Sequence, residues 1–148
     1  IYGIGSSSVV AREFKLRFMR LGLDVDYLAE AHSIRMNVTR VNEKSLVIGI
    51  SVSGKTEEVV NGLKDAKAKG AQTIMLSAAR VYEYRDCYNE LVLIGGLKNL
   101  AISDKISPQV PALMVIDILY RHYLHYNMSH KEEKLKMTLE HIDYELEE

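Results

Sequence analysis

Residues 46–50, Leu-Val-Ile-Gly-Ile, form a continuous apolar run that constrains the fold more than any other stretch of the chain. A strand that is apolar on both faces has to be covered on both faces, as happens in parallel sheets. Residues 51–54 then read Ser-Val-Ser-Gly, and a helical period follows with its apolar stripe at Val59, Leu63 and Ala66. This segment predicts a buried parallel strand, a tight turn and a helix that packs on the sheet.

The rest of the chain repeats the alternation of strand and helix. Further strands are expected at residues 1–4, 25–28, 73–76 and 90–94, and further helices at about 6–21, 30–41, 107–126 and 131–146. Short connections between alternating elements predict an α/β fold, a three-layer α/β/α arrangement around a five-stranded parallel sheet. We expect residues 1–148 to form a single domain, with its ligand at the carboxyl ends of the strands near the change in strand order.

Composition excludes several classes of function. The 148 residues carry a net charge of −1 without a basic stripe, so this segment is a poor candidate for binding nucleic acid itself. No apolar run approaches the ~20 residues that span a bilayer. Cys87 is the single cysteine and no cysteine–histidine spacing suits a metal, so we expect no metal, no cofactor and a cytoplasmic protein. The chain begins as the end of a strand, which suggests a fragment of a longer protein.

Residues 49–56 satisfy the pattern G-x-x-x-x-G-K-T of nucleotide-binding loops. Residues 50–52 continue the alternation of the strand, however, and leave a turn shorter than such a loop. The acidic residue that would hold magnesium, Asp117, falls in an apolar run that follows two prolines and reads as helix. A nucleotide hydrolase is therefore disfavoured. A dinucleotide site is disfavoured as well, because Ser8 occupies the place of a fingerprint glycine.

Two serine-rich turns point to a different ligand. Residues 3–8, Gly-Ile-Gly-Ser-Ser-Ser, follow the first strand, and residues 51–56, Ser-Val-Ser-Gly-Lys-Thr, follow the long apolar strand. Each turn opens a helix, where backbone amides favour an anion and glycine lets the main chain approach it. Hydroxyl groups add hydrogen bonds to sugar hydroxyls without a strong positive charge. The pair is typical of a site for a phosphorylated, polyhydroxylated small molecule.

At these residues the chain resembles a SIS (sugar isomerase) domain, through Gly-x-Gly-Ser-Ser at residues 3–7 and Ser-x-Ser-Gly-x-Thr-x-Glu at residues 51–58. Residues 107–119 resemble a helix opening in RpiR-type transcriptional regulators, which join an N-terminal helix-turn-helix domain to a C-terminal SIS domain. The resemblance implies a flavodoxin-like sheet, a phosphosugar ligand and usually a homodimer. It also implies that DNA is contacted through a helix-turn-helix domain that these residues lack.

The resemblance also implies which residues bind the sugar phosphate. Phosphate contacts are expected from the second turn, and the first turn lines the other side of the pocket; the residues are Ser51, Ser53, Gly54, Thr56, Gly5, Ser6 and Ser7. Ser107 is either a further ligand contact or the N-cap of the long helix. The regulators usually carry an arginine where this chain has Gln109, which speaks against a ligand contact by Gln109.

An aldose–ketose isomerase would also need a positioned acid and base. Glu57 and Glu58 are the candidates, but acidic residues in the first turn of a helix are also favourable charges there. None of the five histidines forms a convincing pair with them. The sequence therefore favours a phosphosugar-sensing effector domain of a transcriptional regulator over an isomerase, with a structural dimerisation domain as a third possibility. The helix at residues 107–126 is apolar nearly all round and predicts a partner subunit. The particular sugar, the operator and the direction of regulation stay open.

Overall fold

The computed structural model describes residues 1–96, 107–126 and 128–143. The elements in chain order are β1 (Tyr2–Gly3), α1 (Ser7–Met19), α2 (Ala31–Asn37), β2 (Leu46–Ile50), α3 (Glu57–Ala68), β3 (Gln72–Ser77), the 3₁₀ helix η1 (Tyr82–Cys87), β4 (Glu90–Leu93), α4 (Val110–His125) and α5 (Met128–Asp143). The predicted alternation of strands and helices is confirmed, and β2 has the bounds that the apolar run indicated.

Within the described residues, four strands form one parallel sheet in the order β1-β2-β3-β4. The strand expected at residues 25–28 is wrong in extent, because Leu28 alone makes a parallel bridge, to Tyr2. Its amide donates to the Ile1 carbonyl at 2.8 Å, and its carbonyl accepts from the Gly3 amide at 3.0 Å. The pairing is short because β1 itself spans two residues. Leu28 thus lies outside β1, so the strand order changes direction at the β1–β2 pair, as in flavodoxin-like sheets.

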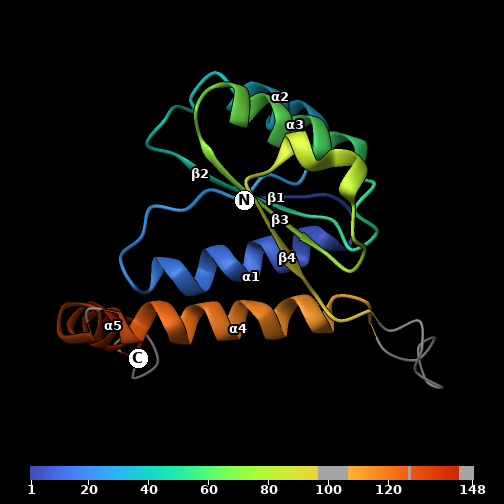
Figure 1. Ribbon diagram of the computed structural model, residues 1–148. Coiled ribbons are helices and arrows are strands. Elements are labelled where there is room, and N and C mark those ends of the chain that lie inside the picture. Colours follow the sequence, from blue (N-terminus) through green and yellow to red (C-terminus); the bar gives the residue numbers. More distant parts are fainter. Residues whose placement is uncertain (97–106, 127, 144–148) are drawn as a thin grey trace.

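Helices cover both faces of the sheet (Figure 1), so the three-layer arrangement is confirmed. On one side α2 and α3 enclose a core that includes Tyr2, Ile34 and Met75. On the other side α1 and α4 enclose a second core that includes Phe14, Ile50 and Ile116. The predicted apolar stripe of α3, at residues 59, 63 and 66, is fully buried. Both faces of β2 are therefore covered, which explains its unbroken apolar sequence.

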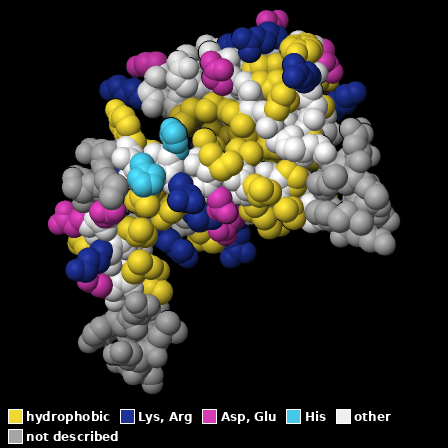
Figure 2. Space-filling view, turned by 60° about the horizontal axis from the view of Figure 1, so that its bottom comes forward, with side chains coloured by type: hydrophobic (Ala, Val, Ile, Leu, Met, Phe, Trp, Pro, Cys, Tyr) yellow, Lys and Arg dark blue, Asp and Glu magenta, His cyan; other side chains and the backbone are white. Residues whose placement is uncertain are grey.

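Helix α4 is much less covered than its composition requires. Pro111, Ala112 and Ile116 are buried, but Met114 and Ile118 are 61% and 63% exposed. Figure 2, which brings the lower side of Figure 1 forward, shows hydrophobic side chains gathered across this side of the molecule among both signs of charge. Among the helices described, none is both long enough and apolar enough to cross a bilayer.

Candidate functional site

The two serine turns meet at one edge of the sheet. Gly3 at the end of β1 pairs in parallel with Ile50 at the end of β2. The chain therefore leaves both strands in the same direction, and the turns of residues 4–6 and 51–56 follow side by side. This is also the point where the strand order changes, the usual ligand position in such sheets. The predicted proximity of the turns is confirmed, and their contacts to a ligand stay a prediction.

Gly3 and Gly5 of the first turn have different structural roles. A Cβ on Gly3 would lie 2.7 Å from the carbonyl oxygen of Ser7, so Gly3 lets α1 begin close against β1. Gly5 has a φ of +59°, a left-handed conformation that favours glycine. The turn leaves Ser6 exposed but buries Ser7 to 7% exposure, with the Ser7 amide donating to the Ile4 carbonyl at 3.2 Å. Of the two serines, Ser6 is the one that presents its hydroxyl at the surface.

The second turn is held by its own side chains. Ser51 is 1% exposed, and its Oγ lies 2.8 Å from Oγ1 of Thr56 and accepts from the Thr56 amide at 3.3 Å. Ser53 is exposed, and its Oγ accepts from the Lys55 amide at 3.2 Å. Ser51 therefore shapes the turn from inside, while Ser53 and the half-buried Thr56 lie on its outer side. Lys55 is exposed.

Gly54 packs closely against the residues at and after the end of β3. It has a φ of +72°, and a Cβ there would lie 2.2 Å from Cγ1 of Val81 and 2.7 Å from Oγ of Ser77. Ser77 is fully buried, and its Oγ accepts from the Ala79 amide at 3.1 Å. Sequence reasoning missed Ser77 and Val81 because they lie more than 20 residues from the turn that they support. A serine at the end of the neighbouring strand was the available signal.

Helix α3 begins directly after the second turn. Its first amides have no acceptor inside the helix and point toward the site, which favours an anion there. Glu57 is exposed and Glu58 is half-buried in this first turn, where carboxylates interact favourably with the helix dipole. The placement fits the interpretation of these two residues as first-turn charges. Helix α2 also begins at this edge, since Leu28 pairs with Tyr2, and it brings the exposed His32 there.

The start of α4 reaches the same edge. Gln109 is the N-cap residue of α4, so the predicted N-cap role of Ser107 is wrong by two positions. The Gln109 side chain donates from Nε2 to Oγ of Ser6 at 2.6 Å, and its Oε1 accepts from the Ser107 hydroxyl. Ser107 is therefore part of the cluster at the first turn. Sequence reasoning missed the place of Gln109, because a contact across 103 positions leaves no local pattern.

The described residues offer no cluster of three or more histidine, cysteine, aspartate or glutamate side chains that could hold a metal ion. Asp117, the one candidate for a magnesium ligand in a nucleotide site, lies inside α4 and forms an ion pair with Arg17 of α1. Residues 49 and 50 belong to β2, so the turn starts too late for a nucleotide loop. The arrangement suits a hydroxyl-rich anion more than a metal-bound triphosphate.

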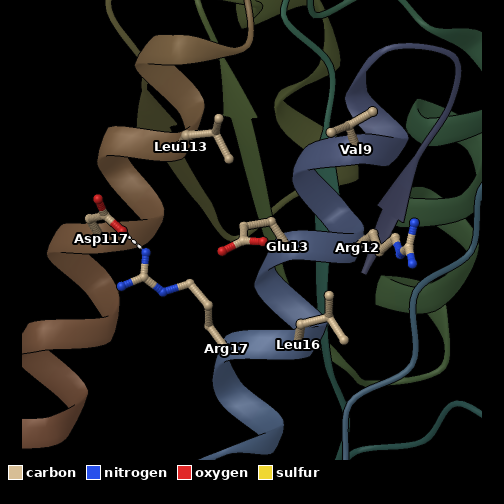
Figure 3. A pocket seen from close by; sticks show the side chains of 7 residues that line it. All are labelled: Val9, Arg12, Glu13, Leu16, Arg17, Leu113 and Asp117. Atoms are coloured by element: carbon tan, nitrogen blue, oxygen red, sulfur yellow. Dashed lines mark hydrogen bonds and ion pairs between the residues drawn. The ribbon is translucent and has the colours of Figure 1, made fainter. Parts of the chain in front are cut away.

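A groove of about 430 Å³ lies outside this site, between α1 and α4. Figure 3 shows that α1 supplies most of its side chains and α4 the others; the lining residues are Val9, Arg12, Glu13, Leu16, Arg17, Leu113 and Asp117. The helices run parallel, with the Ser6–Gln109 hydrogen bond at one end and the Arg17–Asp117 pair farther along. Apolar side chains and side chains of opposite charge both line the groove, which distinguishes it from the hydroxyl-rich edge of the sheet.

Comparison with known proteins gives matches of both sequence and fold. The SIS domain profile matches residues 1–80. An uncharacterized HTH-type transcriptional regulator of Haemophilus influenzae is 33% identical over 124 residues, which are 81% of this chain and 42% of that protein. The chain thus spans less than half the length of this relative.

Two solved structures share the fold. The Vibrio vulnificus NanR protein, complexed with ManNAc-6P, superposes with a TM-score of 0.81 at 23% identity, over 95% of this chain and 53% of that one. The sugar isomerase domain of an RpiR transcription factor from Sphaerobacter thermophilus gives a TM-score of 0.77 at 19% identity, over 97% of this chain and 76% of that one. At these identities the likeness establishes the architecture, which is the one predicted.

Proposed function

The chain belongs to the SIS domain family, and from this premise we propose that it is the effector-sensing domain of a transcriptional regulator of carbohydrate metabolism, with a sugar phosphate as its ligand. The observation that carries the proposal is the parallel pairing of Gly3 with Ile50, which sets the two serine turns side by side. The NanR protein of the same fold is described in complex with a phosphorylated sugar, ManNAc-6P. That description agrees with the chemistry of the turns.

The phosphate group belongs at the second turn. The first amides of α3, the hydroxyls of Ser53 and Thr56, and the main chain at Gly54 would surround it there. The sugar would extend toward the first turn, where Gly5 lets the main chain approach and Ser6 offers a hydroxyl that both donates and accepts. Ser7 and Ser51 are buried beneath the two turns and would stabilise their conformation. Neither a metal nor a cofactor enters this scheme.

Regulation would require a DNA-binding part beyond residues 1–148. The curated relative is named an HTH-type regulator, and this chain corresponds to 42% of its length. We therefore assign DNA contacts to a helix-turn-helix domain outside the present residues and place the protein in the cytoplasm, where the chromosome of a bacterium lies. A ligand would act by favouring one arrangement of two subunits over another.

The face of α1 and α4 is our assignment for the contact between those subunits. Met114 and Ile118, one turn apart on α4, and Val9 on the adjacent helix α1 are all more than 60% exposed, and exposed apolar side chains of this size can mark an interaction surface. The neighbouring groove carries Arg12 and Glu13, so the face holds charges of both signs. A two-fold dimer places the same surface against itself and needs such self-complementarity.

A thermal-shift screen tests the proposed ligand class. Amino-sugar, hexose and pentose phosphates are compared with inorganic phosphate and with the unphosphorylated sugars. A ligand at 100 times its dissociation constant stabilises the folded state by about 2.7 kcal/mol, which for a chain of this size is a rise in Tm of roughly 5–10 °C. A screen in which no sugar phosphate raises Tm above the inorganic phosphate control would favour a purely structural dimerisation domain.

The alternative function, an aldose–ketose isomerase, is tested by an assay for turnover. The same sugar phosphates are incubated with purified protein and their aldose and ketose forms are quantified. Sustained turnover that is lost in the double variant Glu57→Gln, Glu58→Gln would replace the sensing proposal with an enzymatic one. Binding without turnover supports a sensor.

A further inference from the structure

The carboxamide of Gln109 joins two hydroxyls at the candidate site. Its Nε2 donates to Oγ of Ser6 at 2.6 Å, and its Oε1 accepts from the hydroxyl of Ser107. The Ser107 Oγ also accepts from the backbone amide of Gln109 at 3.4 Å, so Ser107 contacts both the main chain and the side chain of Gln109. Ser6 and Ser107 are exposed and Gln109 is half-buried, which places this contact at the surface of the sheet edge and not in the core.

This cluster differs chemically from the second turn. A carboxamide carries one acceptor oxygen and two N–H donors and has no net charge. It therefore adds no attraction for a phosphate beyond that of any polar group, but it can pair with sugar hydroxyls or an acetamido group, which both donate and accept. A positively charged guanidinium at this position would offer donors alone. Gln109 accordingly suits the neutral end of a phosphorylated sugar.

The position of the cluster agrees with this chemistry. Ser6 follows β1, whereas residues 51–56 and the start of α3 follow β2, the adjacent strand. A sugar phosphate anchored at α3 would extend across the edge of the sheet toward Ser6. There it would reach the side chain of Gln109, which is hydrogen-bonded to Ser6 and Ser107.

We propose that Gln109 is a specificity-determining residue of the sugar-phosphate site, whose carboxamide exchanges its hydrogen bonds to Ser6 and Ser107 for hydrogen bonds to the sugar. The inference rests on the proposed function and adds a residue outside the two serine turns. It makes Gln109 responsible for recognising the sugar, while the turn of residues 51–56 recognises the phosphate.

The test uses Gln109→Met, which keeps the length of the side chain and removes its hydrogen bonds. Gln72→Met is the matched control, because Gln72 is exposed at the start of β3, at the opposite edge of the sheet. Calorimetry measures binding of N-acetylglucosamine 6-phosphate, glucose 6-phosphate, ribose 5-phosphate and inorganic phosphate. We expect Gln109→Met to weaken the tightest of the three sugar phosphates about tenfold, as the loss of one or two hydrogen bonds does, and to change inorganic phosphate by less than about twofold.

The outcomes separate this inference from the proposed function. If the wild-type protein binds one of the three sugar phosphates and Gln109→Met binds it equally well, Gln109 has no role in recognition. An equal loss for the sugar phosphate and for inorganic phosphate would indicate general damage to the site and would also overturn the inference. Wild-type protein that binds none of these three sugar phosphates and none of those in the thermal-shift screen contradicts the proposed function itself. Ser107→Ala, which removes one of the two partners of Gln109, provides a second variant for the same comparison.

Discussion

Oγ of Ser51 lies 2.8 Å from Oγ1 of Thr56 and also accepts a hydrogen bond from the Thr56 amide at 3.3 Å. Both contacts form inside one turn of six residues, and Ser51 is 1% exposed. The turn therefore keeps its shape through its own polar groups. Ser53, two residues farther along, is exposed at the same turn. We therefore predict separable roles for the two serines of this motif, Ser51 in stability and Ser53 in binding.

Ser51→Ala should lower the stability of the folded protein. The substitution leaves the Thr56 amide and hydroxyl without their buried partner, at a cost of about 1–2 kcal/mol. Urea unfolding measures the difference, and Ser53→Ala is the control because an exposed serine should change stability by less than about 0.5 kcal/mol. Equal stability of Ser51→Ala and the wild-type protein would show that the turn does not depend on this hydroxyl.

Ser53→Ala should instead weaken ligand binding. Loss of one hydroxyl contact to phosphate is expected to raise the dissociation constant by a factor of about 5–30, or roughly 1–2 kcal/mol. Ser45→Ala is closely matched, since Oγ of Ser45 also accepts an amide hydrogen bond at 3.2 Å in an exposed turn, but at the opposite end of β2. Calorimetry with the best sugar phosphate from the screen measures both variants. If they bind alike, Ser53 is not a phosphate contact.

Gly54→Ala should disrupt the second turn. The added Cβ meets Val81 at 2.2 Å and Ser77 at 2.7 Å, and the φ of +72° adds strain of about 1 kcal/mol or more for any other residue. Gly70→Ala is the control for the strain alone, because its φ is +86° and the nearest atom to its Cβ would lie at 3.4 Å. We expect a larger fall in Tm for Gly54→Ala than for Gly70→Ala, together with loss of ligand binding. A similar fall in both would mean that the turn adapts to the clash.

Ile118→Glu should separate the proposed dimer. Ile118 is 63% exposed on α4, and a carboxylate placed there would be desolvated in a contact with a second copy. Met36→Glu, at a 71% exposed position on α2, controls for the added charge. Sedimentation velocity at micromolar concentration should find dimers of the wild-type and Met36→Glu proteins and monomers of Ile118→Glu. A wild-type monomer contradicts the assignment of this face.

Cys87 should react slowly with thiol reagents in the folded protein. The side chain is 5% exposed, and burial raises the pKa of its thiol, which keeps the thiolate fraction small at pH 8. Labelling with a chromogenic disulfide should become fast in urea, where the thiol is exposed and its pKa is normal. Rapid labelling of the native protein would indicate that η1, which ends at Cys87, opens readily.

Local patterns were sufficient to predict most of the fold. The apolar run of β2 and the apolar stripe of α3 predicted which residues are buried. Gly70 has a positive φ, as is common for a glycine that ends a helix. Helix α2 ends at Asn37 and not near residue 41, because the chain turns there, with the Thr39 amide donating to the Met36 carbonyl. A turn of this kind can end a helix even where the spacing of apolar residues in the sequence continues, so the sequence pattern did not predict the end of α2. The predicted end of the last helix, residues 144–146, lies outside the described residues.

Those parts of the candidate site that are marked by a short sequence motif could be predicted. Glycine and serine directly after a strand mark both turns, and parallel pairing then brings the turns together. The burial of Ser7 and Ser51 could not be read from the sequence, because it depends on how the helices pack. The contacts of Gln109 with Ser6 and of Gly54 with Val81 join segments far apart in the chain, and single side chains leave no periodic trace of such contacts.

The close approach of Gly54 to Ser77 and Val81 leaves little room for other side chains at the base of the candidate site, whereas the rim of the site, at Ser53 and Gln109, is less tightly packed. A larger side chain at position 77 or 81 would therefore displace the main chain at Gly54, which is expected to hold the anion. Ser53, by contrast, is exposed, and the half-buried Gln109 contacts the exposed Ser6 and Ser107, so a new side chain at either position disturbs the main chain less. A lineage of such sensors could acquire another effector by exchanging rim residues one at a time, and laboratory redesign of the ligand preference should begin at the same two positions.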